Sequence, residues 1–329
     1  MPAPSWDKLS GIMKDKYKTK ARLVGTEIAM PVFIAVFAGI VALVEPRFLS
    51  VANLRNLAVQ IAPLTIIAVG QAFTVIAGGL DLSIAAVMAL SGVAGILAVP
   101  HVGLAGGLAC MILVGGLAGL LNGLIISRLR ASPLIVTLGI ASIAEAIALI
   151  LSNGVPLYAV PGELTSTIGF GRILGINTSF LVALAMLALG AFLLRFTVFG
   201  RYVYAVGSNQ SAAFKSGINV PLVTMLVYAF AGVMGGVAAI VMTAWVSAAA
   251  PVAQPGLTLQ SIAAVVLGGV LLTGGAGGMR HVLYGVLVLG TMTNAMNMLG
   301  ISSYYQILAI GIVIIAAVSL DVFRKQSRT

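Results

Sequence analysis

The sequence predicts an all-α polytopic membrane protein, a class that composition and hydropathy indicate together. Hydrophobic residues make up 60% of the 329 residues and charged residues only 8%, whereas soluble domains carry about 25% charged residues. The mean hydropathy is +1.13, and many apolar runs are long enough to cross about 30 Å of hydrocarbon as helices. So little charge cannot cover a water-facing surface, which excludes a soluble protein.

Ten apolar runs are expected to be transmembrane helices of a single domain, 1–329, that begins with a basic cytoplasmic tail at 1–26. The runs lie near 27–44, 59–79, 83–100, 103–127, 134–152, 177–195, 222–246, 258–273, 282–299 and 304–321. An even number of spans places both termini on one side, and the positive-inside rule makes that side the cytoplasm. Only Arg47, Arg55 and Arg172 of the 18 basic residues then lie outside. The formal charge of +10 thus reflects orientation in a lipid membrane, and no nucleic-acid partner is expected.

Two connections are longer than simple turns. The segment 153–176 is expected outside, as a periplasmic loop that forms either an ordered cap facing a delivery partner or a plain connector. The segment 196–221 is expected inside, where Asn209–Ser216 has the small apolar residues of a short helix lying along the membrane. The alternative is a solvated loop anchored by Tyr202 and Tyr204. Because equal numbers of spans precede and follow residue 160, the pattern also allows a 5+5 inverted repeat.

The sequence contains none of the common catalytic motifs. It has no G-x-x-x-x-G-K-[ST] phosphate loop, no H-E-x-x-H, no C-x-x-C and no G-x-S-x-G. Cys110 is the one cysteine, and His101 and His281 fall at opposite faces of the predicted membrane. We therefore expect no catalytic residue, no metal and no cofactor, and any energy from ATP would have to come from another subunit.

Several groups of residues, in order along the chain, resemble one known family. The first groups are Pro46 to Ser50 with Asn53, Leu54 and Asn56; Val69 and Gly70; and Ala77 to Ser83. The next are Gly119 to Gly123; Pro133 with Thr137, Leu138 and Gly139; and Gly200, Arg201, Gly217 and Ile218. The last are Ala263, Val265, Leu267, Gly268 and Gly269; and Ser303 to Gln306. Over nearly the whole chain, this series resembles the permease subunits of ribose, xylose and arabinose importers of the ATP-binding cassette (ABC) type.

The resemblance implies a permease in the bacterial inner membrane that pairs with a second permease subunit, either a copy of itself or a related chain. Such a permease accepts a sugar from a periplasmic binding protein and passes it inward, while separate ATPase subunits hydrolyse ATP. The inner loop would be the ATPase coupling segment, with contacts at Asn209, Gln210, Ala212, Ala213 and Gly217.

The chain departs from the family pattern at three places. Gly207 to Gln210 stand where Gly-Gly-Asn-Glu is common, and Glu145 and Ala146 stand where an Arg-Gly pair is usual. Before Ile262, where an acidic residue is frequent, the chain has Leu259, Gln260 and Ser261. These departures leave room for a solute other than the common pentoses.

Polar residues inside apolar runs are the candidates for a solute path, because an unsatisfied polar group in hydrocarbon is costly. Glu145 is one, about twelve residues into its span, and the neutral ones are Gln71, Asn122, Gln260, Asn294 and Asn297. Each could instead be a helix-packing contact. For Asp81 we expect a structural role, because Gly78, Gly79 and Ser83 around it suggest a broken turn in which Asp81 caps the next helix.

Two other functions fit the same pattern. An ion-coupled secondary transporter also has about ten spans and inverted repeats, although a proton relay usually needs a chain of acidic residues. The second alternative is an importer of the same architecture that carries amino acids, polyols or autoinducer-like furanones.

Overall fold

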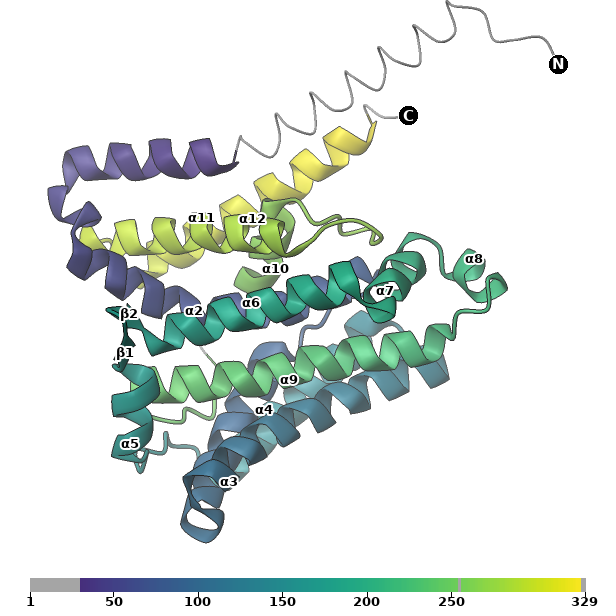
Figure 1. The fold of residues 1–329 in the computed structure, drawn as a ribbon, viewed down its shortest axis with the longest axis horizontal. Coiled ribbons are helices and arrows are strands. Elements are labelled where there is room, and N and C mark those ends of the chain that lie inside the picture. Colours follow the sequence, from purple (N-terminus) through teal and green to yellow (C-terminus); the bar gives the residue numbers. More distant parts are fainter. Residues whose placement is uncertain (1–29, 254–255, 327–329) are drawn as a thin grey trace, which may run out of the picture.

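The computed structural model describes residues 30–253 and 256–326, and within them nearly all regular structure is helical (Figure 1). A helix at Met30–Val44 is followed by η1 (Pro46–Leu49), α2 (Val51–Ile76), α3 (Ile84–Leu129) and α4 (Pro133–Ser152). Next come α5 (Gly162–Leu164), η2 (Thr165–Gly169), β1 (Arg172–Ile173), β2 (Ile176–Asn177) and α6 (Thr178–Phe196). The last are α7 (Val198–Ser208), α8 (Gln210–Lys215), α9 (Val220–Val246), α10 (Leu257–Gly268), α11 (Met279–Met298) and α12 (Ser303–Gln326). The expected tail at 1–26 lies outside the described residues.

The helices agree with an all-α membrane protein, while the number of spans stays a prediction. In the described part of the chain, α2, α3, α4, α6 and α9 are long and apolar enough to cross a membrane. Helix α3 has 46 residues and is interrupted at Gly103, where φ is 73° and Pro100 lies just before. This break separates the expected spans 83–100 and 103–127, because proline removes a helical hydrogen bond and glycine tolerates positive φ.

Two helix boundaries differ from the sequence expectation. Helix α2 begins at Val51, eight residues before the expected 59, because Ser50 caps it and accepts a hydrogen bond from the Asn53 backbone N–H. Because of this cap, the helix includes polar residues before position 59 that the hydropathy pattern leaves out of the predicted span. Helix α10 has 12 residues and ends at Gly268, short of the expected 273, because Gly269 takes a φ of 111°. Of the expected run 258–273, only the first part is therefore helical.

The connections gather at two ends of the helix bundle. Figure 1 shows α7 and α8 at the right, at the end where α12 finishes, and η1, α5 and the two strands at the left. We call these the inner and outer ends, after the predicted topology. At the inner end, Arg128 lines a surface hollow with Asn219, so that the end of α3 lies beside the beginning of α9.

Helix α2 occupies the centre of the bundle. Its most apolar stretch of 18 residues is 94% buried, and the helix contacts α6, α9, α10 and α11.

Helices α3 and α9 pack closely against each other through glycines. A Cβ added at Gly119 would overlap the Tyr228 carbonyl oxygen and lie 2.9 Å from the Gly232 Cα. Backbones that approach this closely need small residues, as is typical of helix packing in membranes.

The segment 153–176 is ordered over the outer end of α9. Leu157 and Ala249 exchange two backbone hydrogen bonds of 2.9 Å, and the Ser179 hydroxyl donates to the Ile168 carbonyl at 2.6 Å. Strands β1 and β2 form a small antiparallel hairpin, whose turn residue Leu174 is 98% exposed. The structure thus shows a cap-like segment, while its periplasmic location stays a prediction.

Candidate transport path and coupling segment

A cavity of about 210 Å³ lies among α2, α9, α10, α11 and α12. Its polar lining consists of Gln60, Trp245, Gln260, Thr293, Ser303 and Gln306. The rest is apolar, contributed by Ile61, Pro63, Leu64, Met242, Leu257, Leu289, Gly290, Ile307 and Ile310. An apolar wall with a few convergent polar groups is the usual form of a small-molecule site.

The lining contains no charged side chain. The amides of Gln60 and Gln260 can both donate and accept hydrogen bonds, and so can the hydroxyls of Thr293 and Ser303. Gln306 offers its Oε1 as an acceptor, because its Nε2 already donates to Asn297 Oδ1 at 2.7 Å and to the Ile301 carbonyl at 3.0 Å. The indole of Trp245 adds a flat apolar face with one N–H donor. A neutral solute with several hydroxyl groups matches this set, whereas a zwitterion would enter with two charges that the lining does not pair.

Of the six path candidates from the sequence, Gln260 is the one that lines this cavity. Gln60, Trp245, Thr293, Ser303 and Gln306 were not among them. Gln60 sits at the expected start of a span, where a polar residue carries no special signal. Ser303 and Gln306 belong to the series of residues that resembles the family, which assigns them no place on the path. Trp245 had no signal of its own, because tryptophan near a helix end is common in membrane proteins. Thr293 had none, because a threonine inside a helix can bond its own backbone.

Asn294 and Asn297 lie close to the cavity but are engaged within the chain. The amides of Asn53 and Asn294 bond reciprocally, at 2.8 and 3.1 Å. Asn53 Nδ2 also donates to the Phe48 carbonyl at 2.8 Å. Asn297 Oδ1 accepts a bond of 2.7 Å from Gln306 Nε2. The first pair joins α2 to α11, and the second orients a glutamine that lines the cavity.

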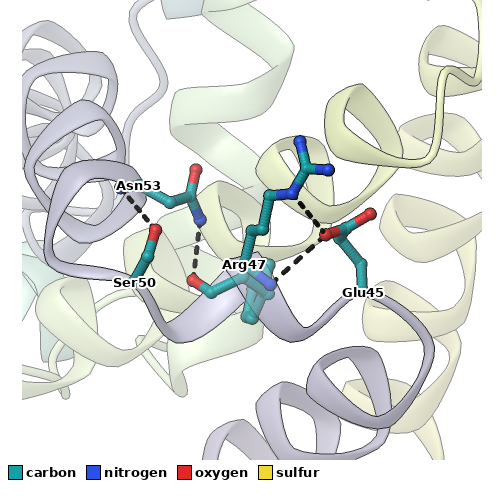
Figure 2. A network of polar contacts seen from close by, with 5 residues as sticks. Glu45, Arg47, Ser50 and Asn53 are labelled. Atoms are coloured by element: carbon teal, nitrogen blue, oxygen red, sulfur yellow. Dashed lines mark hydrogen bonds and ion pairs between the residues drawn. The ribbon is translucent and has the colours of Figure 1, made fainter.

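Figure 2 shows the surroundings of Asn53 at the outer end. The Asn53 backbone N–H donates to Ser50 Oγ at 3.2 Å, and its side chain points to the preceding turn. Beside it, the carboxylate of Glu45 accepts from the Arg47 backbone N–H at 3.2 Å and lies 3.8 Å from Arg47 Nε. The Arg47 side chain is 87% exposed, so this ion pair contributes little to stability.

Gln71 and Asn122 are both fully buried around the turn at 77–83. With its amide oriented to satisfy both atoms, Gln71 donates to the Asp81 carbonyl at 2.9 Å and accepts from the Asp81 backbone N–H at 3.3 Å. Asn122 Nδ2 donates to Ser83 Oγ at 2.8 Å. These bonds hold the turn, and a contribution of either amide to the solute path stays a prediction.

The carboxylate of Asp81 is held inside the same turn. It accepts from the Ser83 backbone N–H at 2.8 Å and from the Ser83 hydroxyl at 2.6 Å. Burial raises the pKa of the Asp81 carboxyl, and the two bonds from Ser83 act against that rise. Gly78 has a φ of 85°, and a Cβ on Gly79 would overlap the Tyr228 hydroxyl. The motif residues thus shape the beginning of α3.

Glu145 lies on the exposed side of α4, thirteen residues after Ser132 and thus past the midpoint of the helix. Its neighbours Ala144 and Ala148 face the chain's own core. Glu145 therefore does not reach the cavity described above. The Glu145 side chain instead lies on the surface of the chain, where it would contact lipid, water or another subunit.

The segment 196–221, which is predicted to couple to the ATPase, contains two helices, α7 and α8, that join at Asn209. The Asn209 side chain caps α8 by accepting from the Ala212 backbone N–H at 2.9 Å, and Gly217 ends the turn after α8 with a φ of 82°. The short helix expected at 209–216 is present, and it stands at the edge of the inner end in Figure 1. Gln210, Ala212 and Phe214 are exposed, Phe214 by 70%, whereas Ala213 is 4% exposed and packs inward.

A bundle of long apolar helices, with a partly open cavity lined by neutral polar groups, fits a membrane transport protein. Residues 53–318 match the family model for the permease component of the branched-chain amino acid transport system. The chain therefore belongs to this permease family, whose members are transport subunits.

Individual relatives cover almost the full length. The ribose import permease protein RbsC of Escherichia coli K12 is 35% identical over 312 residues, which is 93% of this chain and 96% of the relative. The L-arabinose ABC transporter permease protein AraH of Azospirillum brasilense is also 35% identical, over 93% of this chain and 90% of the relative. The D-allose transport system permease protein AlsC of E. coli K12 is 34% identical, over 90% of each. These findings confirm the resemblance to sugar importer permeases.

Proposed function

We propose that this chain is the permease subunit of an ABC importer that moves a neutral monosaccharide or a similar polyol across the bacterial inner membrane. The observation that carries the proposal is the uncharged cavity, in which Gln60, Gln260 and Gln306 converge beside Trp245. The relatives named for ribose, arabinose and allose support the same solute class. The ATP would be hydrolysed by partner subunits, and both termini would lie in the cytoplasm in a ten-span topology.

The cavity favours a sugar over an amino acid, although the family model takes its name from amino acid transport. An amino acid crosses as a zwitterion and needs a partner for its ammonium and its carboxylate. No residue that lines the described cavity provides a charge. A monosaccharide instead exchanges hydrogen bonds with water for bonds with amides and hydroxyls, which costs little net free energy.

Glu145 is proposed to face a second permease subunit or a water-filled path between the two subunits. An ionised carboxylate in the middle of a span costs a few kcal/mol if it faces lipid. The exposed face of α4 that carries Glu145 also carries Leu138 and Ser142, so a partner could cover it by packing against Leu138. The solute would then meet the cavity in one part of its route and Glu145 in another.

The two ends of the bundle are proposed to meet different partners. At the inner end, α8 offers Phe214 as an apolar knob that a groove in an ATPase subunit could hold. At the outer end, the ordered segment 153–176 offers its hairpin to the periplasmic binding protein that delivers the solute. This division follows from the predicted topology.

Transport by the assembled complex in proteoliposomes tests the proposal. Wild type should import radiolabelled D-ribose, L-arabinose or D-allose in the presence of ATP and its binding protein. Trp245→Ala should lower the uptake efficiency about ten-fold, because it removes an aromatic contact and some apolar burial, whereas Trp245→Phe should retain most of it.

Two outcomes would contradict the proposal. Sugar uptake that follows an imposed proton or sodium gradient without ATP would identify a secondary transporter. Uptake of leucine, but of none of the three sugars, would identify an amino acid importer.

A further inference from the structure

Three segments meet through their backbones at the inner end, at a place that we call the inner junction. It consists of Ile76 at the end of α2, Gly207 and Ser208 at the end of α7, and Gly274 and Gly275 between α10 and α11. The Gly275 N–H donates to the Ile76 carbonyl at 2.8 Å. The junction therefore ties together segments that are far apart in the sequence.

The glycines leave no room for a side chain between these segments. A Cβ added at Gly207 would overlap the Ile76 carbonyl oxygen and lie 2.7 Å from the Gly275 nitrogen. A Cβ added at Gly274 would lie 2.8 Å from the Gly207 carbonyl oxygen and 3.0 Å from the Gly78 Cα. Backbones in such direct contact move together or separate, because a packed contact does not deform continuously.

Tyr204 provides a second attachment one turn earlier on α7. Its hydroxyl donates to the Gly277 carbonyl at 2.9 Å. Its ring is half-buried and packs on the hydrophobic core. Helix α7 is thus fixed to the connection between α10 and α11 at two points, by Tyr204 and by the end of the helix.

The segments joined here lead directly to the two functional regions. On one side, Asn209 alone separates α7 from α8, the helix proposed to contact the ATPase. On the other side, α2, α10 and α11 carry Gln60, Gln260 and Thr293 into the cavity. A displacement of α8 would therefore reach three of the cavity helices through the inner junction.

We propose that the inner junction transmits the movement of the coupling segment to the solute cavity, with Tyr204 as a positioning residue. The proposal rests on the proposed function, because it takes α8 as the ATPase contact and the cavity as the solute site. It assigns coupling to backbone contacts around Gly207 and to one tyrosine hydroxyl, none of which touches solute or nucleotide.

The test compares Tyr204→Phe with Tyr202→Phe in the assembled complex. Phenylalanine keeps the ring at both positions, but only at position 204 does it remove a hydrogen bond present in the structure. One hydrogen bond corresponds to roughly a two- to ten-fold effect. We expect Tyr204→Phe to lower the number of sugar molecules imported per ATP hydrolysed by this factor, with normal subunit assembly and basal ATPase activity. Tyr202→Phe, at an exposed position on the same helix, should leave the ratio unchanged.

Gly207→Ala and Gly139→Ala form a second pair. The added methyl group at 207 meets backbone, whereas at 139 it meets open space. Gly207→Ala should reduce the same ratio further, and Gly139→Ala should not. If the Gly207→Ala complex does not assemble, the comparison of Tyr204→Phe with Tyr202→Phe alone tests the proposal.

An unchanged ratio in an assembled Tyr204→Phe complex would overturn the role of Tyr204 and the proposal with it. A wild-type complex that imports neither these three sugars nor any other neutral monosaccharide or polyol would instead show that the proposed function is wrong.

Discussion

The reciprocal amide pair between Asn53 and Asn294 allows a quantitative test of packing against transport. Asn294→Leu removes both bonds of the pair and leaves Asn53 Oδ1 buried without a partner, which should cost about 1–3 kcal/mol of unfolding free energy. Asn53→Leu leaves both polar atoms of Asn294 without a partner and also removes the bond to the Phe48 carbonyl. Its cost should therefore be roughly twice as large.

The double variant should be less destabilised than the sum of the single variants by about 1–3 kcal/mol, because neither orphaned amide remains. Reversible unfolding in mixed micelles measures all three, with Asn56→Leu as the control at an exposed position of α2; the control should change the free energy by less than about 0.5 kcal/mol. Strictly additive costs would refute the paired arrangement. An Asn294→Leu protein with wild-type stability but no sugar uptake would place Asn294 on the path instead.

Three further predictions concern topology, coupling and the path. In a cysteine-free background, an impermeant reagent applied to intact cells should label a cysteine at Ser166 and not one at Ser211; the reverse result would invert the topology. Phe214→Glu should weaken co-purification of the ATPase while the bundle stays folded, whereas Ala213→Glu should also lower stability, because it buries a charge; full ATPase recovery with Phe214→Glu would contradict the coupling role. Glu145→Gln should retain partial uptake and Glu145→Leu should lose most of it, so wild-type rates for the leucine variant at equal expression would remove Glu145 from the path.

Hydropathy correctly predicted an all-α protein with long apolar helices, because the membrane requires such helices and leaves few alternatives. The number of ten spans stays a prediction. The break between the third and fourth expected spans is present at Gly103, and the short helix at 209–216 is present as α8. The expectation was wrong where a local signal overrides hydropathy. The cap at Ser50 extends α2 outward, and the positive φ at Gly269 ends α10 early. Neither depends on how apolar the segment is.

The cavity lining was harder to predict than the fold, because the same polar residue types can pack helices or line a cavity. Thr293 and Asn294 are adjacent in α11, yet Thr293 lines the cavity and Asn294 pairs with Asn53. Successive residues of a helix point about 100° apart, so a rotation of α11 by this angle would turn Asn294 toward the cavity in place of Thr293. That rotation is fixed by the residues of α2 that face α11, which lie some 240 positions earlier in the sequence.

The amide side chains that line the cavity and those that hold the turn at 77–83 are alike in being polar but uncharged. They differ in what completes their hydrogen bonds. Gln71 uses both polar atoms of its amide on the turn, and Asn122 Nδ2 donates to Ser83 Oγ there, so a passing solute would have to displace a protein partner at these atoms. Gln260 borders open volume instead, where water or a sugar hydroxyl can take the same place in turn. A transport path needs bonds that are made and released at small net cost, and this is the physical reason to place the solute at Gln260 and Trp245 and not at the buried turn.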